Sequence, residues 1–584
     1  MNKYLKSLIS YIIKWNPLGT TTTRRPGQRL KSDEIIVRLV IGDIVGRKHL
    51  LKDLPWTPNK SVLDRVPTDR LYPDPDILPL KNNITIFSFL GVPYAEPPTS
   101  NRRFRSPQII TQLPTEEPFT AFEFGPSCAQ DIKSRPFLRV RTPYPHVVSE
   151  DCLYLNIYTP DASKKSGKSY PVIVFFHGGN NQWGSSSDWP GHILASHGQV
   201  VVTVNYRLGA FGFMSLGDKE TGNYGLQDQR CALEWVQFYI SAFGGDPRSV
   251  TIAGHDGGGV DVQLHMLSMY SKSLFRQAIS LSGGVTSYHT TIGKPELAFN
   301  NTIKLGRYLG CVDNIPFRVW DCILTRSTKD IIEATATIPI EYSRYLFLPS
   351  VDGRIIGSHP RWMLENAPSG ATNIPSPVPL LIGLNKQDGV EAIIEDRKLG
   401  EFTDFLEVDN EWLRSFAIEY AFRHNYTMNR EAIAEAIISE YTFWPDYSNS
   451  WMIREKIIEL LSDIYYVTPI TQTADLFSKA GSRVFMYVNN YNFSRVNMNK
   501  SDHFPAWMGG GHECDLYLLF GFPYLPKELL PLQFQDFTFI EQDRNASFVF
   551  STIVKQFVKV TDPNLPTEFQ WIPYQPRAHV CLIK

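Results

Sequence analysis

One carboxylate stands where the local sequence is built to present a side chain. Residues 249–253 read Ser-Val-Thr-Ile-Ala, a β-branched run that predicts a strand, and residues 259–267 can continue as a helix. Between them lies Gly-His-Asp-Gly-Gly at 254–258. Small residues on both sides of Asp256 permit a sharp strand-to-helix turn, from which one side chain projects at the end of the strand. We therefore expect Asp256 to lie at the centre of a chemical site.

The surrounding elements define the folded region. The run Thr-Thr-Thr-Thr-Arg-Arg-Pro-Gly at 20–27 is typical of a flexible linker, and the apolar run at 35–40 predicts a first strand. We expect residues 1–33 to be a flexible N-terminal segment and residues 34–584 to form one domain. Near the other end, residues 548–558 place apolar side chains on one face of a predicted helix.

Several motifs in this domain resemble those of a known family. They are FLGVPYAEPP at 89–98, SEDCLYLN at 149–156, NYRLG at 205–209, GNYGLQDQR at 222–230 and FGGDP at 243–247. In this order they closely resemble the carboxylesterase/cholinesterase family, and the resemblance runs from about residue 34 to the end of the chain. It implies the α/β-hydrolase fold, of the α/β class, in which helices flank a large, mostly parallel central sheet.

The resemblance also implies a catalytic triad in the chain order nucleophile, acid, histidine. The matching positions are Asp256, Asp388 in GLNKQDG at 383–389, and His512 in PAWMGGGH at 505–512. The family carries serine at the first position and usually glutamate at the second. Asp388 keeps a carboxylate that can orient an imidazole, whereas Asp256 lacks the nucleophilic hydroxyl. The resemblance therefore predicts a degenerate triad.

The family's oxyanion hole is altered as well. His-Gly-Gly-Asn at 177–180 follows an apolar strand and resembles the family's H-G-G-G loop with its last glycine replaced. The matching positions are Gly178, Gly179, Asn180 and Gly257, whose backbone donors must point at a developing oxyanion. Asparagine tolerates the left-handed region, so the loop can keep its shape. We expect the Asn180 side chain to take space that substrate uses in relatives.

The turn between the predicted strand and helix corresponds to the nucleophile elbow of the family, and we call it the elbow. Aspartate at this position changes the chemistry of the site. A carboxylate is a poor nucleophile toward an acyl carbon, and beside His512 it would hold the imidazole protonated and unable to act as a base. We therefore predict a pseudoenzyme without ester turnover. Two alternatives stay open. Asp256 could attack sp³ carbon, as in epoxide hydrolases and haloalkane dehalogenases, or the inactive pocket could serve as a small-molecule receptor.

Cysteines and sequons indicate an oxidising compartment. The pairs Cys128 with Cys152 and Cys311 with Cys322 match disulfides of the family. Asn-X-Ser/Thr glycosylation signals begin at Asn59, Asn83, Asn300, Asn425, Asn492, Asn499 and Asn545. Both features favour an extracellular or cell-surface protein.

Composition and resemblance together suggest the role. The 584 residues carry a formal net charge of -1 and 20% charged side chains, so nothing marks a nucleic-acid binder. The sequence indicates no cofactor and no metal site. Chains that keep this fold without the serine resemble cholinesterase-like adhesion molecules of the neuroligin, gliotactin, glutactin and neurotactin type.

The resemblance to these adhesion molecules implies binding to another extracellular protein, in cell adhesion or junction formation. The sequence does not name that partner, and no membrane anchor is visible in it. In the family the last long helix often pairs with its symmetry mate. The helix predicted at 548–558 is therefore a candidate homodimer interface.

Overall fold

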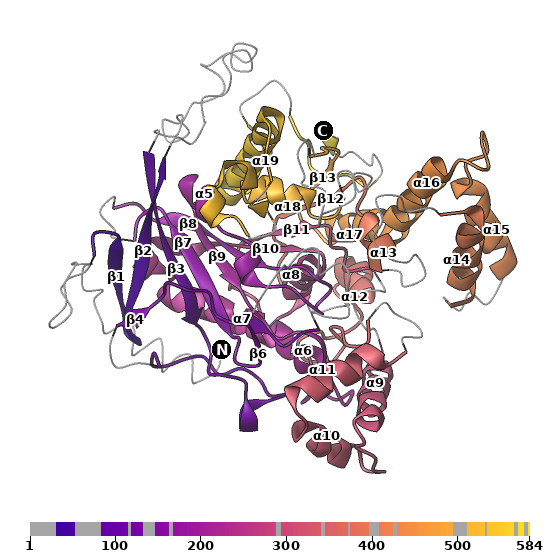
Figure 1. Cartoon of the computed structure of the whole chain (residues 1–584), viewed down its shortest axis with the longest axis horizontal. Coiled ribbons are helices and arrows are strands. Elements are labelled where there is room, and N and C mark those ends of the chain that lie inside the picture. The colour runs from indigo at the N-terminus through magenta and orange to yellow at the C-terminus, as the bar shows by residue number, and fades with distance from the viewer. Residues whose placement is uncertain are drawn as a thin grey trace.

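A twelve-stranded sheet runs through the described part of the chain, and helices cover both of its faces (Figure 1). The computed structural model describes residues 31–52, 83–114, 118–131, 147–162, 167–287, 294–339, 345–371, 374–395, 408–423, 429–493, 511–531, 534–535, 537–565, 570–576 and 582–583. Most of the predicted flexible segment, residues 1–30, lies outside these ranges.

The sheet combines an antiparallel edge with a parallel centre. Strands β1, β2, β3 and β7 pair antiparallel, and from β9 to β14 every pair is parallel. In spatial order the strands are β1 (Glu34–Leu39), β2 (Gly42–Lys52), β3 (Asn83–Pro93), β7 (Tyr154–Thr159), β9 (Val200–Val204), β8 (Tyr170–Phe176), β10 (Gly245–His255), β11 (Gln277–Leu281), β12 (Leu380–Asn385), β13 (Val484–Asn489) and β14 (Leu582–Ile583). β4 (Phe119–Thr120) pairs with β2, while β5 (Ser127–Cys128) and β6 (Val148–Ser149) form a separate pair.

Helices follow most of the parallel strands. They are α5 (His192–Ser196), α6 (Gly209–Phe213), α7 (Tyr224–Tyr239), α8 (Gly257–Leu267), α9 (Pro295–Tyr308), α10 (Pro316–Leu324), α11 (Thr328–Thr337), α12 (Pro360–Asn366), α13 (Val390–Glu395), α14 (Asn410–Arg423), α15 (Arg430–Tyr441), α16 (Ser450–Ser462), α17 (Thr468–Lys479), α18 (Cys514–Leu519) and α19 (Glu541–Val560). A π-helical turn, Asp463–Val467, joins α16 to α17.

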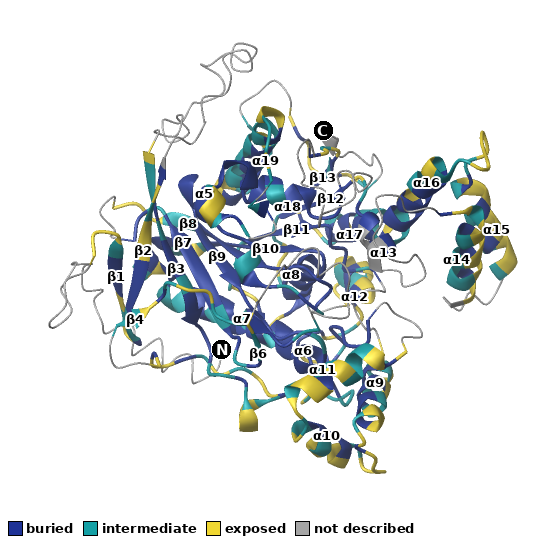
Figure 2. Ribbon diagram, viewed as in Figure 1, coloured by how far each residue is buried: buried dark blue, intermediate teal, exposed yellow. Residues whose placement is uncertain are grey.

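Two hydrophobic cores form because both faces of the parallel strands are buried. In β8, Val172 and Val174 belong to the core shared with α7, α8 and α17, whereas Ile173 and Phe175 belong to the core shared with α5, α18 and α19. Figure 2 shows this buried interior and the exposed outer turns of α14 and α15, which project from the body. Such alternation explains why the strands read as continuous apolar runs.

The structure confirms the predicted fold class, an α/β protein with a large, mostly parallel sheet. The strand expected before Asp256 is β10, and the helix expected after it is α8. The helix predicted at 548–558 lies within α19. No helix in the described ranges has the length and apolar character of a membrane span.

Candidate functional site

Asp256 sits in a sharp turn between β10 and α8. Its backbone has φ 51° and ψ -118°, a conformation that L-residues rarely adopt and that the surroundings must hold. The Asp256 N–H donates to the Leu281 carbonyl at 2.9 Å, which ties the turn to the neighbouring strand. A Cβ on Gly254 would lie 2.2 Å from the Gly258 carbonyl oxygen, so the chain closes on itself too tightly for a larger residue. The glycines therefore create the turn that presents Asp256.

The carboxylate of Asp256 lies against the loop that the resemblance assigns to the oxyanion hole, called here the oxyanion loop. Its Oδ2 accepts hydrogen bonds from the N–H of Gly179 at 3.0 Å and from the N–H of Asn180 at 2.7 Å. Asp256 is only 3% exposed. The other two predicted positions, Gly178 and Gly257, pack closely around Asp256 and its loop. A Cβ on Gly178 would lie 3.2 Å from the Asp256 Cβ, and a Cβ on Gly257 would lie 2.8 Å from the Asn180 Cα.

Asn180 adopts the left-handed conformation that the sequence allowed, with φ 50°. Its side-chain amide donates to the Tyr345 hydroxyl at 3.0 Å, and both side chains are buried. The residue thus links the oxyanion loop to the segment between α11 and α12. Sequence reasoning did not identify Tyr345, because nothing in its local pattern marks a residue 165 positions away as a partner.

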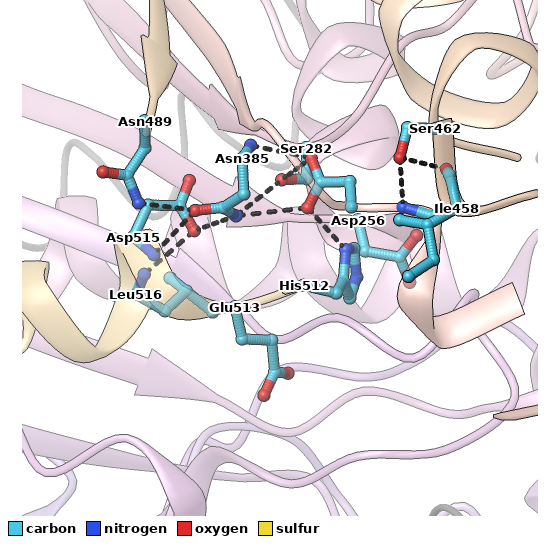
Figure 3. A network of polar contacts seen from close by, with 12 residues as sticks. Asp256, Ser282, Asn385, Ile458, Ser462, Asn489, His512, Glu513, Asp515 and Leu516 are labelled. Carbon is cyan, nitrogen blue, oxygen red and sulfur yellow. Dashed lines mark hydrogen bonds and ion pairs between the residues drawn. The ribbon is translucent and has the colours of Figure 1, made fainter. Parts of the chain in front are cut away.

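The residues predicted as acid and histidine, Asp388 and His512, lie together. His512 Nδ1 lies 3.0 Å from Asp388 Oδ1, and both residues are buried. His512 and Asp256 belong to one network of polar contacts (Figure 3). Asp388 Oδ2 accepts hydrogen bonds from the Ser282 hydroxyl at 2.9 Å and from the Asn385 N–H at 2.8 Å. These bonds fix the carboxylate so that it can orient the imidazole.

The fold brings the three predicted positions into one site. His255, the residue before Asp256, has its ring centroid 4.4 Å from that of His512. On another side the Tyr466 ring, from the π-helical turn, lies 5.0 Å from the His512 ring. Side chains from β10, the segment after β12 and the segment before α18 therefore meet at the carboxyl ends of parallel strands.

A second buried carboxylate, Asp515, lies beside Asp388 and shares the Asn385 side chain with it. Asp515 accepts hydrogen bonds from the Tyr487 hydroxyl at 2.7 Å and from the Asn385 side chain at 2.9 Å. Burial, followed by the charge of Asp388, raises the pKa of Asp515 to about 6. Asp515 follows His512 by three residues in the sequence, and this proximity could have marked it as part of the site. The sequence prediction did not include it.

A third buried carboxylate, Asp261, lies on α8 one turn beyond the elbow. It accepts hydrogen bonds from Gln229 at 2.6 Å and from Asn181 at 3.1 Å. Burial, together with the smaller effect of the nearby charge of Asp256, raises the pKa of Asp261 to about 7, although the hydrogen bonds from Gln229 and Asn181 lower it. Asp256 and Asp261 therefore hold adjacent residues of the oxyanion loop.

Both cysteine pairs implied by the resemblance are bonded in the structure. Cys128 is joined to Cys152, and Cys311 to Cys322. Among the predicted sequons, Asn83, Asn300 and Asn492 are exposed, Asn545 is half-buried on α19, and Asn59, Asn425 and Asn499 lie outside the described residues. Within the described ranges, no group of three or more His, Cys, Asp or Glu side chains is placed to hold a metal ion.

Comparison with known proteins identifies the family. The model of the carboxylesterase family matches residues 77–582. The chain belongs to the carboxylesterase family. This carboxylesterase-family chain is 31% identical to acetylcholinesterase of Bungarus fasciatus over 467 residues, covering 76% of the chain and 72% of that enzyme.

Its relatives include neuroligin-like proteins. The family member described here is 56% identical to the neuroligin-like protein glit-1 of Caenorhabditis elegans over 569 residues, covering 97% of the chain and 78% of glit-1. It is 30% identical to mouse neuroligin-3 over 568 residues, covering 86% of the chain and 64% of that protein. The chain thus spans about three quarters of glit-1 and under two thirds of neuroligin-3.

Proposed function

We propose that this chain is a non-catalytic, neuroligin-like protein of the cell surface that binds another extracellular protein in adhesion or junction formation. The observation that carries the proposal is the Asp256 carboxylate in the oxyanion hole. A substrate carbonyl oxygen would need the N–H groups that Asp256 already engages. The similarity to glit-1 and neuroligin-3 supports the adhesion role.

The absence of the serine hydroxyl prevents ester hydrolysis even though the other two triad positions are kept. His512 and Asp388 keep their hydrogen bond, but an acyl-enzyme requires a nucleophile that Asp256 does not supply. Removal of a triad nucleophile lowers the rate by on the order of a millionfold. The comparisons give no support to the alternative of an Asp-nucleophile hydrolase.

The surface supports an extracellular location. Two disulfides are stable in oxidising compartments, and three predicted glycosylation sites, at Asn83, Asn300 and Asn492, are exposed. We further propose a homodimer through α19. Val549 of this helix is 37% exposed and available for contact, while Ile553, Val554 and Phe557 pack on the sheet.

A turnover assay tests the non-catalytic part of the proposal. The purified glycosylated chain is incubated with a panel of esters, an epoxide and a haloalkane, with His512→Ala as the control. We expect no turnover above the rate of the His512→Ala variant. Turnover that disappears in this variant would contradict the proposal and give Asp256 a catalytic role.

A cell-binding assay tests the adhesion part. Fluorescent tetramers of the full chain are applied to cells, and we expect saturable binding that mild protease treatment of the cells abolishes. The His512→Ala variant should bind equally well, because recognition uses the outer surface and not the buried site. Binding that survives protease treatment would rule out a protein partner.

A further inference from the structure

We infer that the oxyanion loop of this chain is a carboxylate-binding site that is filled from within by Asp256. The inference deepens the proposed function, on which it rests, since it concerns the same inactive site. It assigns Asp256 a positive role as an internal ligand that holds the loop in place. When the aspartate side chain is removed, the site should accept a small free carboxylate.

The backbone of the loop has the form of an anion site. Gly179, Asn180 and Asn181 follow one another with φ of 97°, 50° and 60°. Successive residues in such turn conformations direct their N–H groups to one concave point. Here the first two N–H groups meet at a single oxygen, Asp256 Oδ2, at 3.0 and 2.7 Å.

The length of the side chain explains why aspartate fits. A serine side chain ends one bond before the carboxylate oxygens, and in an esterase the N–H groups wait for the oxygen of the substrate. Without substrate, buried N–H groups that lack an acceptor are costly. Asp256, which is 3% exposed, places a carboxylate acceptor there.

The loop transmits this restraint to its surroundings. The Asn180 side chain donates to the Tyr345 hydroxyl at 3.0 Å, and the Gln182 side chain donates to the Phe347 carbonyl at 2.6 Å. The segment between α11 and α12 is therefore attached to the Asp256 turn through the loop. Loss of the carboxylate should loosen the loop and this segment together.

Chemical rescue tests the inference. In Asp256→Gly the two N–H groups lose their acceptor, and we expect the melting temperature to fall by about 2–5 °C. Acetate, exchanged for chloride at constant ionic strength, should bind the vacated site and restore much of this loss in a saturable manner. The unmodified protein should not respond to acetate.

A matched variant separates this site from general effects of acetate. Asp543 is also buried and accepts hydrogen bonds from the Tyr491 hydroxyl at 2.7 Å and from the Ile540 N–H at 2.9 Å. Asp543→Gly should be destabilised without a specific response to acetate. An equal response of both variants, or an Asp256→Gly protein as stable as the original, would overturn the inference.

A second variant keeps the test decisive if Asp256→Gly does not fold. Asp256→Asn retains the shape of the side chain and removes its charge. We expect amide hydrogen exchange in a peptide covering residues 178–181 to be about tenfold faster in this variant. Unchanged exchange would overturn the inference.

The two failures can be told apart. Ester turnover by the unmodified chain would refute the proposed function, whatever acetate does to Asp256→Gly. Absence of the specific acetate response, or of the exchange difference, would refute the internal ligand alone.

Discussion

Among the buried carboxylates around His512 and the oxyanion loop, three bind partners of different kinds. Asp256 binds backbone N–H groups, Asp388 binds His512, and Asp261 binds the side chains of Asn181 and Gln229. Their chemical roles differ because their donors differ. Asp261 receives only amide donors, which compensate poorly for the desolvation of a charge.

Stability should depend on pH through Asp261. Its pKa is raised to about 7 in the folded state, above a value of about 3.9 in the unfolded chain. A raised folded pKa stabilises at low pH, and this stabilisation is lost as the pH rises through the folded value. Asp261→Asn does not titrate, so we expect its melting temperature relative to the original protein to increase between pH 4 and pH 8. The difference in the free energy of unfolding between the two proteins cannot change by more than about 1.4 kcal/mol per pH unit.

The control for this prediction is a partly exposed carboxylate, Asp246, whose pKa shifts in the opposite direction. A hydrogen bond from Arg248 lowers the pKa of Asp246, so its contribution is lost only at acid pH. Asp246→Asn should therefore differ from the original protein by a constant amount above pH 5. A flat pH profile for Asp261→Asn as well would show that Asp261 is ionised throughout.

At the scale of elements, the acid position depends on how α16 packs against the segment after β12. Gly389 follows Asp388, and its N–H donates to the Ser462 hydroxyl at 2.9 Å. Ser462 ends α16, where the π-helical turn begins. Such turns frequently lie at functional sites, and this one places Tyr466 against His512.

Gly389→Ala should disrupt this contact. An added Cβ would lie 2.3 Å from the Ser462 backbone nitrogen and 2.7 Å from the Ile458 carbonyl oxygen. We expect a loss of about 1–3 kcal/mol in the free energy of unfolding, measured by urea denaturation. Gly357→Ala is the control, because its Cβ would meet nothing within 4 Å. Equal stability of both variants would show that α16 can move away from Gly389.

At the scale of the whole molecule, α19 packs one face on the sheet and leaves other residues exposed. Ile553, Val554 and Phe557 are buried in the core on the sheet. Val549, one turn beyond the sequon at Asn545 and one turn before Ile553, lies at the exposed edge of that face. A glycan at Asn545 would therefore lie next to the proposed dimer contact.

Val549→Arg tests the proposed homodimer. We expect the mass in solution, measured by light scattering, to fall from dimer to monomer, because a buried interface does not accept an unpaired charge. The melting temperature of the monomer should change little, since Val549 is 37% exposed. Val312→Arg, at a site 78% exposed between α9 and α10, should leave the mass unchanged. A dimer that persists in Val549→Arg would place the interface elsewhere.

Local sequence predicted those parts of the site that depend on neighbouring residues. The β-branched run before Asp256 and the glycines around it predicted β10, the turn and α8, because backbone conformation there follows from residue type. The positions of Asp388 and His512 came from longer motifs. Asp515 and Tyr345 were missed, since their roles depend on contacts across the fold.

The sequence by itself determined that the elbow carries a carboxylate and no hydroxyl, because that is a matter of residue identity at position 256. It also determined the family, through motifs distributed over the chain. Only the tertiary structure decided where the carboxylate points. Asp256 reaches Gly179 and Asn180, which are 77 and 76 residues away in sequence, because parallel strands β8 and β10 end side by side. Spatial adjacency of this kind depends on strand order, and no local pattern of residues encodes it.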